Sequence, residues 1–135
     1  MRATFKKSER LCGKKLLEST HRNGLAVKVF PFILLYNQST FEEPVPAKLA
    51  ISIPRKRVKL AVKRNRLKRR VRESYRVNKA PLYDLLEQQE KQLAMLLIFV
   101  GRDENLDSKL VNKKISSLLA RLCKEIAGDN QEEAI

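Results

Sequence analysis

The chain has very few of the residue types that build catalytic and metal centres. Its 135 residues include two cysteines, one histidine and no tryptophan. Cys12 and Cys123 form no CxxC pair and His21 stands alone, so neither a Cys/His metal site nor a Ser/His/Asp centre has a supporting pattern. The cysteines are expected to be reduced, partly buried thiols. Catalysis by the side chains of this protein alone is therefore not expected.

Long apolar runs and low-complexity tracts are also missing. The longest apolar run, residues 93–100, is far short of the roughly 20 residues that span a bilayer, and it suits a buried strand. The charged N-terminus is followed by no apolar segment of the kind found in secretory signals, so a cytoplasmic protein is expected. With 43% hydrophobic residues, the chain is predicted to form one domain over residues 1–128, followed by a disordered acidic tail over residues 129–135.

What the chain does have is concentrated positive charge. Residues 55–79 contain thirteen Lys or Arg and a single acid, Glu73, so this window carries +12 of the net charge of +14. The rest of the chain is close to neutral. Charge of this density is typical of a surface that faces a polyanion, and a nucleic-acid backbone is the obvious candidate.

Hydrophobic periodicity and turn residues divide the chain into alternating helices and strands. The predicted segments are a short helix over 9–20, strand over 25–36 interrupted by Pro31, a strand over 48–53, a basic helix over 59–78, a short helix within 79–92, a buried strand over 93–100, and a long helix from 107 or 108 to 128. The order α-β-β-β-α-β-α predicts an α+β fold, a two-layer α/β sandwich in which helices pack on a small mixed sheet.

The basic helix separates into an apolar and a cationic side when its residues are placed 100° apart. Leu60, Leu67, Val71 and Tyr75 fall on one side and are expected to pack on the sheet. The polar row consists of Asn65, Arg69, Arg72 and Arg76, with Lys68 and Lys79 at its edge and Arg66 and Arg70 extending it. Arginine grips phosphate with a planar fork of donors, so this row is suited to tracking a phosphate backbone.

Other interpretations of the basic helix remain open from the residues alone. It could be a solvated charged face, although like charges at i, i+3 and i+4 would then repel each other with almost no acidic side chains to offset the repulsion. A calmodulin-target or membrane-surface helix would need the apolar side that the sheet also needs. No helix-turn-helix, zinc or zipper pattern surrounds the helix, and composition does not decide between DNA and RNA.

Residues 61–76, AVKRNRLKRRVRESYR, resemble the signature helix of the bacterial ribonuclease P protein component. The family's core is R-N-R followed by (I/L)-K-R and R-E, and Arg64-Asn65-Arg66, Leu67-Lys68-Arg69 and Arg72-Glu73 match it in order and spacing. Residues 6–11, 32–36 and 52–56 resemble the family's opening helix, first long strand and the stretch that enters the basic segment. The resemblance covers roughly residues 5–126.

The resemblance implies a fold and a function. The family's basic helix links parallel strands by a left-handed crossover, whereas general rules favour a right-handed one. In ribonuclease P, an endonuclease and hydrolase of tRNA processing, the RNA subunit with Mg²⁺ removes the 5′ leader of precursor tRNA, and the protein alone is not catalytic. The protein binds the catalytic RNA and the leader, so the implied partners are ribonuclease P RNA and precursor tRNA, with no membrane and no protein partner.

The resemblance also implies site residues. The positions that match the motif contacting the catalytic RNA are Arg64, Asn65, Arg66, Lys68, Arg69, Arg72 and Arg76. The positions that match the leader cleft are Phe32, Tyr36, Ser52, Arg55 and Lys56. Phe32 and Tyr36 could stack on unpaired bases or simply be core residues. No catalytic or metal-binding side chain is implied, because Mg²⁺ is held mainly by the RNA.

This chain departs from the family pattern in two places. Many relatives have an apolar-aromatic pair where Thr20 and His21 stand, and His21 could replace the aromatic residue or be an exposed surface histidine. Many relatives also have a glycine before the basic helix, where this chain has Arg57-Val58-Lys59.

The competing interpretation is a structural RNA-binding protein of ribosomal type. A protein-only nuclease ranks last, since its candidate acids, Asp84, Glu87, Asp103, Glu104 and Asp107, lack a metal-binding spacing.

Overall fold

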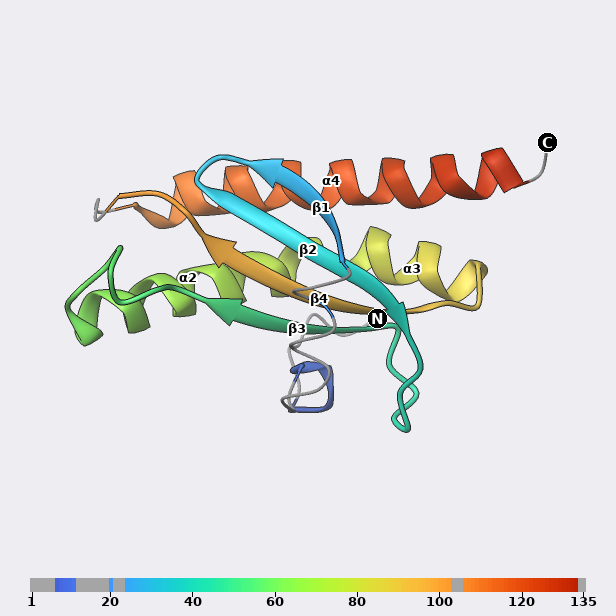
Figure 1. Cartoon of the computed structure of the whole chain (residues 1–135), viewed down its shortest axis with the longest axis horizontal. Helices are drawn as coiled ribbons and strands as arrows, with labels where there is room; N and C mark the ends of the chain where they lie inside the picture. The colour runs from blue at the N-terminus through green and yellow to red at the C-terminus, as the bar shows by residue number, and fades with distance from the viewer. Residues whose placement is uncertain (1–6, 12–19, 21–23, 103–105, 134–135) are drawn as a thin grey trace.

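Four strands form one mixed sheet in the order β1-β2-β4-β3 (Figure 1). The computed structural model describes residues 7–11, 20, 24–102 and 106–133, with side chains for 8–11, 20, 24–102 and 106–128. The strands are β1 (Leu25–Val29), β2 (Phe32–Ser39), β3 (Ala47–Ser52) and β4 (Gln92–Phe99). β1 and β2 form a hairpin, β2 pairs antiparallel with β4, and β3 pairs parallel with β4.

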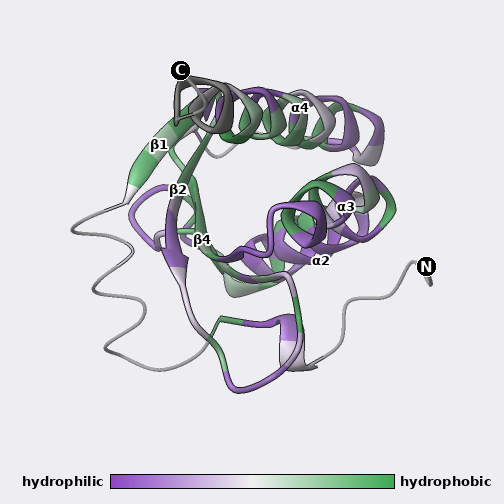
Figure 2. Cartoon of the chain, turned by 90° about the vertical axis from the view of Figure 1, so that its right-hand side faces the viewer, coloured by the Kyte–Doolittle hydropathy of each residue, from purple (hydrophilic) through white to green (hydrophobic). Residues whose placement is uncertain are grey.

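Three helices cover one face of this sheet and make the second layer (Figure 2). They are α2 (Ala61–Asn78), α3 (Ala80–Gln88) and α4 (Ser108–Glu133). α2 and α3 connect the parallel strands β3 and β4, and α4 packs against α2, α3 and β1. The α+β sandwich predicted from the order of elements is therefore confirmed.

The crossover from β3 to β4 is left-handed. In Figure 1 the helices lie behind the sheet, and the parallel strands β3 and β4 both run from right to left. β4 lies above β3 in this view, so the chain moves upwards as it crosses behind the sheet from β3 to β4. A right-handed connection on this side of the sheet would have to move the other way. The hand expected from the resemblance is thus the one observed.

Several boundaries differ from those predicted. β2 extends to Ser39, and the strand interrupted by Pro31 is a hairpin whose turn is Phe30-Pro31. α4 begins after Asp107, whose carboxylate accepts a hydrogen bond from the Leu110 amide at 2.8 Å, as predicted for an N-cap. The prediction that Gly128 ends this helix is wrong, since α4 runs on to Glu133 and so includes most of the predicted disordered tail. One glycine costs a helix only about 1 kcal/mol relative to alanine.

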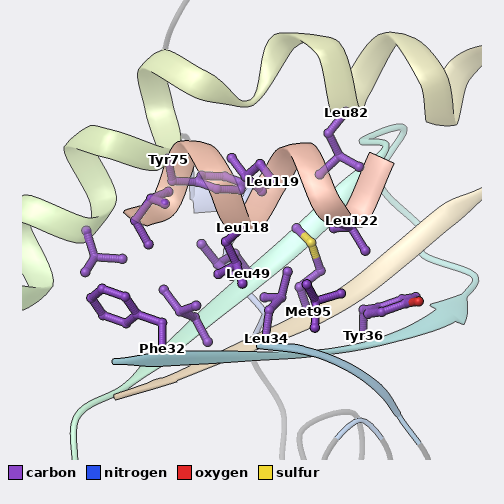
Figure 3. Packing of buried hydrophobic residues seen from close by; sticks show 14 of the residues in the cluster. Phe32, Leu34, Tyr36, Leu49, Tyr75, Leu82, Met95, Leu118, Leu119 and Leu122 are labelled. Atoms are coloured by element: carbon purple, nitrogen blue, oxygen red, sulfur yellow. The ribbon is translucent and has the colours of Figure 1, made fainter. Parts of the chain in front are cut away.

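The hydrophobic core lies between the sheet and the helices (Figure 3). Because side chains alternate along a strand, β2 sends Phe32, Leu34 and Tyr36 towards the helices. Phe32 packs edge-on against Phe99 of β4, with ring centroids 5.8 Å apart. The Tyr36 hydroxyl donates to the Glu125 carboxylate of α4 at 2.6 Å, so its ring is held between sheet and helix.

The N-terminal segment is attached to the crossover by a buried ion pair. Of the predicted helix over 9–20 the structure describes residues 9–11 and 20, while Cys12 and His21 lie outside the described residues. The predicted start of this helix is wrong, since Glu9 ends a 3-10 turn, η1 (Lys7–Glu9), and Arg10 forms an isolated parallel bridge with Leu49 of β3. The Lys79 ammonium, between α2 and α3, lies 2.5 Å from the Glu9 carboxylate, and these side chains are only 3% and 8% exposed. The Leu11 amide donates to the Leu49 carbonyl at 3.0 Å, which places the segment against the edge strand β3.

No helix in the described part of the chain combines the length and the apolar character that crossing a bilayer requires.

Removing one member of the buried pair should destabilise the fold strongly. In Glu9→Ala or Lys79→Ala the remaining charge stays buried without its partner, which costs about 3–5 kcal/mol. Urea unfolding of each variant and of the double variant measures this cost, and the double variant should lose less than the sum of the two singles. A loss below about 0.5 kcal/mol in both single variants would contradict a buried pair.

The buried tyrosines of the crossover predict a loss of stability at high pH. Burial raises the pKa of Tyr75 and of Tyr83, whose hydroxyls are 3.0 Å apart. Because the folded-state pKa lies above the unfolded value near 10, their contribution is complete below about pH 10 and is lost as the pH rises further. Absorbance at 295 nm, assigned with Tyr75→Phe and Tyr83→Phe, should show that they ionise only when circular dichroism reports unfolding. Ionisation in the folded protein would contradict this.

Candidate nucleic-acid interface

The connection from β3 sets the start of the basic helix. Ile53 and Val58 are buried and anchor the turn between them, in which the Val58 amide donates to the Pro54 carbonyl at 3.1 Å. Leu60 at the N-cap supplies no side-chain cap. Instead the Arg64 guanidinium donates to the Val58 and Lys59 carbonyls at 2.9 and 2.8 Å. Arg64 therefore holds the turn against the first turn of α2, while part of its guanidinium stays available.

The inner face of α2 fixes the direction of the whole helix. Leu67, Val71 and Tyr75 are at most 7% exposed and belong to the core, as predicted. Leu60, predicted to join them, is 59% exposed, because it precedes the helix and so does not follow its periodicity. With three buried side chains one turn apart, the opposite side of α2 must face solvent.

The side of α2 that faces away from the core carries a continuous cationic row, which we call the α2 ridge. It consists of Asn65, Arg66, Lys68, Arg69 and Arg72. All but Lys68 are exposed, and Lys68 is half-buried. Among the residues that the structure describes, none makes a hydrogen bond or ion pair with the four cations of the ridge. Their donors are thus available to an external anion.

Two other arginines of α2 are engaged within the protein. Arg76 pairs with Glu73 one turn earlier, and its Nε lies 3.1 Å from the Glu73 carboxylate. The hydrogen bond from Arg76 lowers the pKa of Glu73, and the same bond raises the pKa of Arg76. Arg70 donates to the Leu106 carbonyl ahead of α4. The predicted contact residue Arg76 thus lies beside the ridge with its charge partly compensated, and Arg70 joins α2 to the α4 segment.

Residues of α4 extend the cationic surface, although no sequence pattern indicates them. A groove of about 630 Å³ runs between the two helices, with Arg66 and Arg69 on one wall and Ser108, Lys109 and Asn112 on the other. Asn78 of α2 donates to the Asn112 side chain at 2.8 Å and holds the walls together. Only the packing of α4 on α2, which no local pattern encodes, brings Lys109 beside the ridge.

The residues predicted for the leader cleft separate into two groups. Ser52 is half-buried at the carboxyl end of β3, and Arg55 and Lys56 are exposed in the turn that follows. Phe32 and Tyr36 are 1% and 5% exposed on the helix side of β2. Core residues cover their rings, so neither has a face available for a base, and the prediction of stacking is corrected for both. The opposite side of β2 presents Ile33, Leu35 and Asn37 instead.

Within the described residues, no three His, Cys, Asp or Glu side chains gather in a group that could hold a metal ion.

Together the fold and the ridge define a small α+β protein that exposes a cationic face of one helix. Comparison with known proteins gives the family. The family model described as Ribonuclease P matches residues 5–123. A ribonuclease P protein component of Porphyromonas gingivalis is 37% identical over 123 residues, which are 89% of this chain and 88% of the relative. The chain belongs to the ribonuclease P protein family.

Solved structures of ribonuclease P proteins have the same fold as this chain. The ribonuclease P protein of Thermotoga maritima is 27% identical, with a TM-score of 0.65 over 84% of this chain and 96% of that one. The Staphylococcus aureus protein shares the fold at 19% identity, with a TM-score of 0.69 over 86% of this chain and 96% of that chain.

Replacing Arg69 and Arg72 with alanine should weaken binding to a folded RNA and lower its salt dependence. Removal of one phosphate interaction should reduce the slope of log K against log [salt] by about one unit. Stability should not fall, because both side chains are exposed and their removal relieves like-charge repulsion of about 1 kcal/mol within the ridge. Filter binding across a range of KCl concentrations measures the slope.

A matched control is Lys28→Ala/Lys124→Ala, which removes two exposed cations outside the ridge. If the control variant and the ridge variant showed the same reduction in slope, net charge rather than the ridge would govern binding.

Proposed function

We propose that this chain is the protein subunit of ribonuclease P, which matures the 5′ ends of tRNA. It binds the catalytic RNA through the α2 ridge and the 5′ leader of precursor tRNA through the end of β3 and the turn that follows it. The endonucleolytic step belongs to the RNA, where bound Mg²⁺ supplies a metal-activated water and charge stabilisation. Family membership over most of the chain supports this function. The observation that carries the ridge assignment is that four cations of one helix face have no partner among the described residues.

The chemistry of the ridge suits a phosphate backbone. A guanidinium donates two parallel hydrogen bonds to one phosphate, which fixes orientation as well as adding affinity. Arg66, Arg69 and Arg72 are spaced about one turn apart, so successive phosphates can be held along the helix. Asn65 both donates and accepts, and in this proposal it contacts a sugar or a base edge.

The protein's contribution to cleavage is electrostatic. Catalytic RNA and precursor tRNA are both polyanions, and they repel each other unless cations lie between them. In this proposal the ridge neutralises phosphates of the catalytic RNA, while Arg55 and Lys56 neutralise phosphates of the leader. Ser52 lies next to these cations and offers a hydroxyl for a sugar or phosphate. The bound state then needs fewer metal ions for charge screening, so the protein should matter most at low Mg²⁺.

Cleavage at low Mg²⁺ tests this function directly. Ribonuclease P RNA of Porphyromonas gingivalis is mixed with 5′-labelled precursor tRNA at a Mg²⁺ concentration that leaves the RNA alone inactive. Addition of this protein should restore cleavage at the mature 5′ end. The Porphyromonas gingivalis protein serves as the positive control, and the Arg69→Ala/Arg72→Ala variant should restore much less.

Two outcomes would contradict the proposal. Binding to the RNA without any rescue would indicate a structural RNA-binding protein of ribosomal type. Cleavage of the precursor by the protein without RNA would place the chemistry in the protein.

A further inference from the structure

One end of the sandwich joins three segments that are far apart in the sequence. The turn between β1 and β2 lies against the end of β4, where the Val100 amide donates to the Pro31 carbonyl at 2.8 Å. The turn between β3 and α2 reaches the same place, where the Arg57 guanidinium donates to the Gly101 carbonyl at 3.4 Å. Figure 1 shows all three connections at its left end.

Phe30, in the turn between β1 and β2, is 70% exposed although its surroundings are closely packed. The next residue, Pro31, is buried. A side chain at Gly101 would place its Cβ 2.7 Å from the Pro31 Cβ and 2.9 Å from the Phe99 Cζ, so only glycine allows this approach. The backbone that carries Phe30 is thus held tightly, while the ring itself has no role in the core. An aromatic ring on a fixed support loses little conformational entropy when a ligand covers it.

The surroundings of Phe30 are cationic. Arg57 and Arg102, from the segments that meet at this end, are exposed, and Arg55 and Lys56 belong to the same turn as Arg57. Asp103 and Glu104, the next acids along the chain, lie outside the described residues. The described part of the chain has six exposed large hydrophobic residues. Phe30 is one of them and lies in the turn between β1 and β2, while Leu60 and Val62 lie at the start of α2.

An exposed ring next to arginines fits single-stranded nucleic acid. Every base offers a π-face for stacking, and arginines beside the ring can hold the adjoining phosphates. A second copy of this chain fits less well, because it would bring another net charge of +14 to a surface of the same sign.

We propose that Phe30 stacks on an unpaired RNA base while Arg57 and Arg102 contact the phosphates beside it. This interaction is separate from the α2 ridge and rests on the proposed function. The nucleotide belongs either to the precursor leader or to an unpaired segment of the catalytic RNA, and binding measurements distinguish these sources.

The test compares Phe30→Ala, Phe30→Trp and the control Leu25→Ala. Leu25, at the other end of β1, is a large apolar residue that is 59% exposed. Leu25→Ala therefore removes a comparable exposed apolar side chain, but far from the proposed stacking site. One arm measures affinity for ribonuclease P RNA alone. The other measures affinity of the reconstituted holoenzyme for precursor tRNA with leaders of increasing length and for tRNA without a leader.

In one of the two arms, Phe30→Ala should weaken binding roughly tenfold, the loss typical of one stacked base. A loss limited to precursors with long leaders assigns the nucleotide to the leader, and a loss for the RNA alone assigns it to the catalytic RNA. Phe30→Trp should stay within about twofold of wild type, since stacking is kept, and Leu25→Ala should bind normally. Thermal unfolding of all variants should match wild type.

Unchanged affinity of Phe30→Ala in both arms would overturn the proposal. An equal loss in Phe30→Trp would exclude stacking, and a change in oligomeric state would assign the ring to a second copy of the chain. Arg69→Ala/Arg72→Ala is measured in parallel. If this ridge variant loses RNA affinity while Phe30→Ala does not, only the Phe30 interaction fails and the proposed function stands.

Discussion

The burial of Leu67, Val71 and Tyr75 against the sheet and α4 determines which side of the basic helix meets solvent. These side chains recur at intervals of four residues, so α2 can dock in only one rotational setting. The setting places Arg66, Arg69 and Arg72 outward together. The proposed binding of the catalytic RNA by the ridge depends on this docking, because the same arginines on a helix free to rotate would not form a preorganised surface.

The magnitudes explain why the fold tolerates such a surface. Like charges three or four residues apart on a helix cost about 0.2–0.5 kcal/mol per pair, and the cations of the ridge include three such pairs, so the cost is about 1 kcal/mol. Burying three large apolar side chains contributes roughly 5 kcal/mol or more. Docking of α2 therefore outweighs its self-repulsion. Bound polyanion would remove the repulsion as well, so binding and folding act in the same direction.

Most of the fold could be predicted from the sequence, since apolar periodicity marks β3, α2, β4 and α4 strongly. Which alternate side chains of β2 face the helices could not be predicted. In the run Phe32 to Tyr36 the side chains are aliphatic or aromatic on both faces, so alternation of polar and apolar residues does not indicate which set faces the helices. The structure turns Phe32 and Tyr36 inward, which is why the stacking prediction for these two residues was wrong.

Contacts between distant parts of the chain could not be predicted either. Lys109 joins the ridge only through the packing of two helices that are far apart in the sequence. The buried Glu9–Lys79 pair joins residues separated by 70 positions. Local periodicity carries no information on which distant charges meet, so both features emerge only from the folded chain.

Photo-crosslinking from the ridge tests the central claim most directly. A photoreactive amino acid is placed at Asn65, on the ridge, and in a second protein at Lys124, an exposed position of α4 outside it. Each protein is exposed to total bacterial RNA, and the captured RNA is sequenced. Capture of ribonuclease P RNA from position 65 and not from position 124 is the predicted result. Equal capture of unrelated RNAs from both positions would contradict a defined interface on α2.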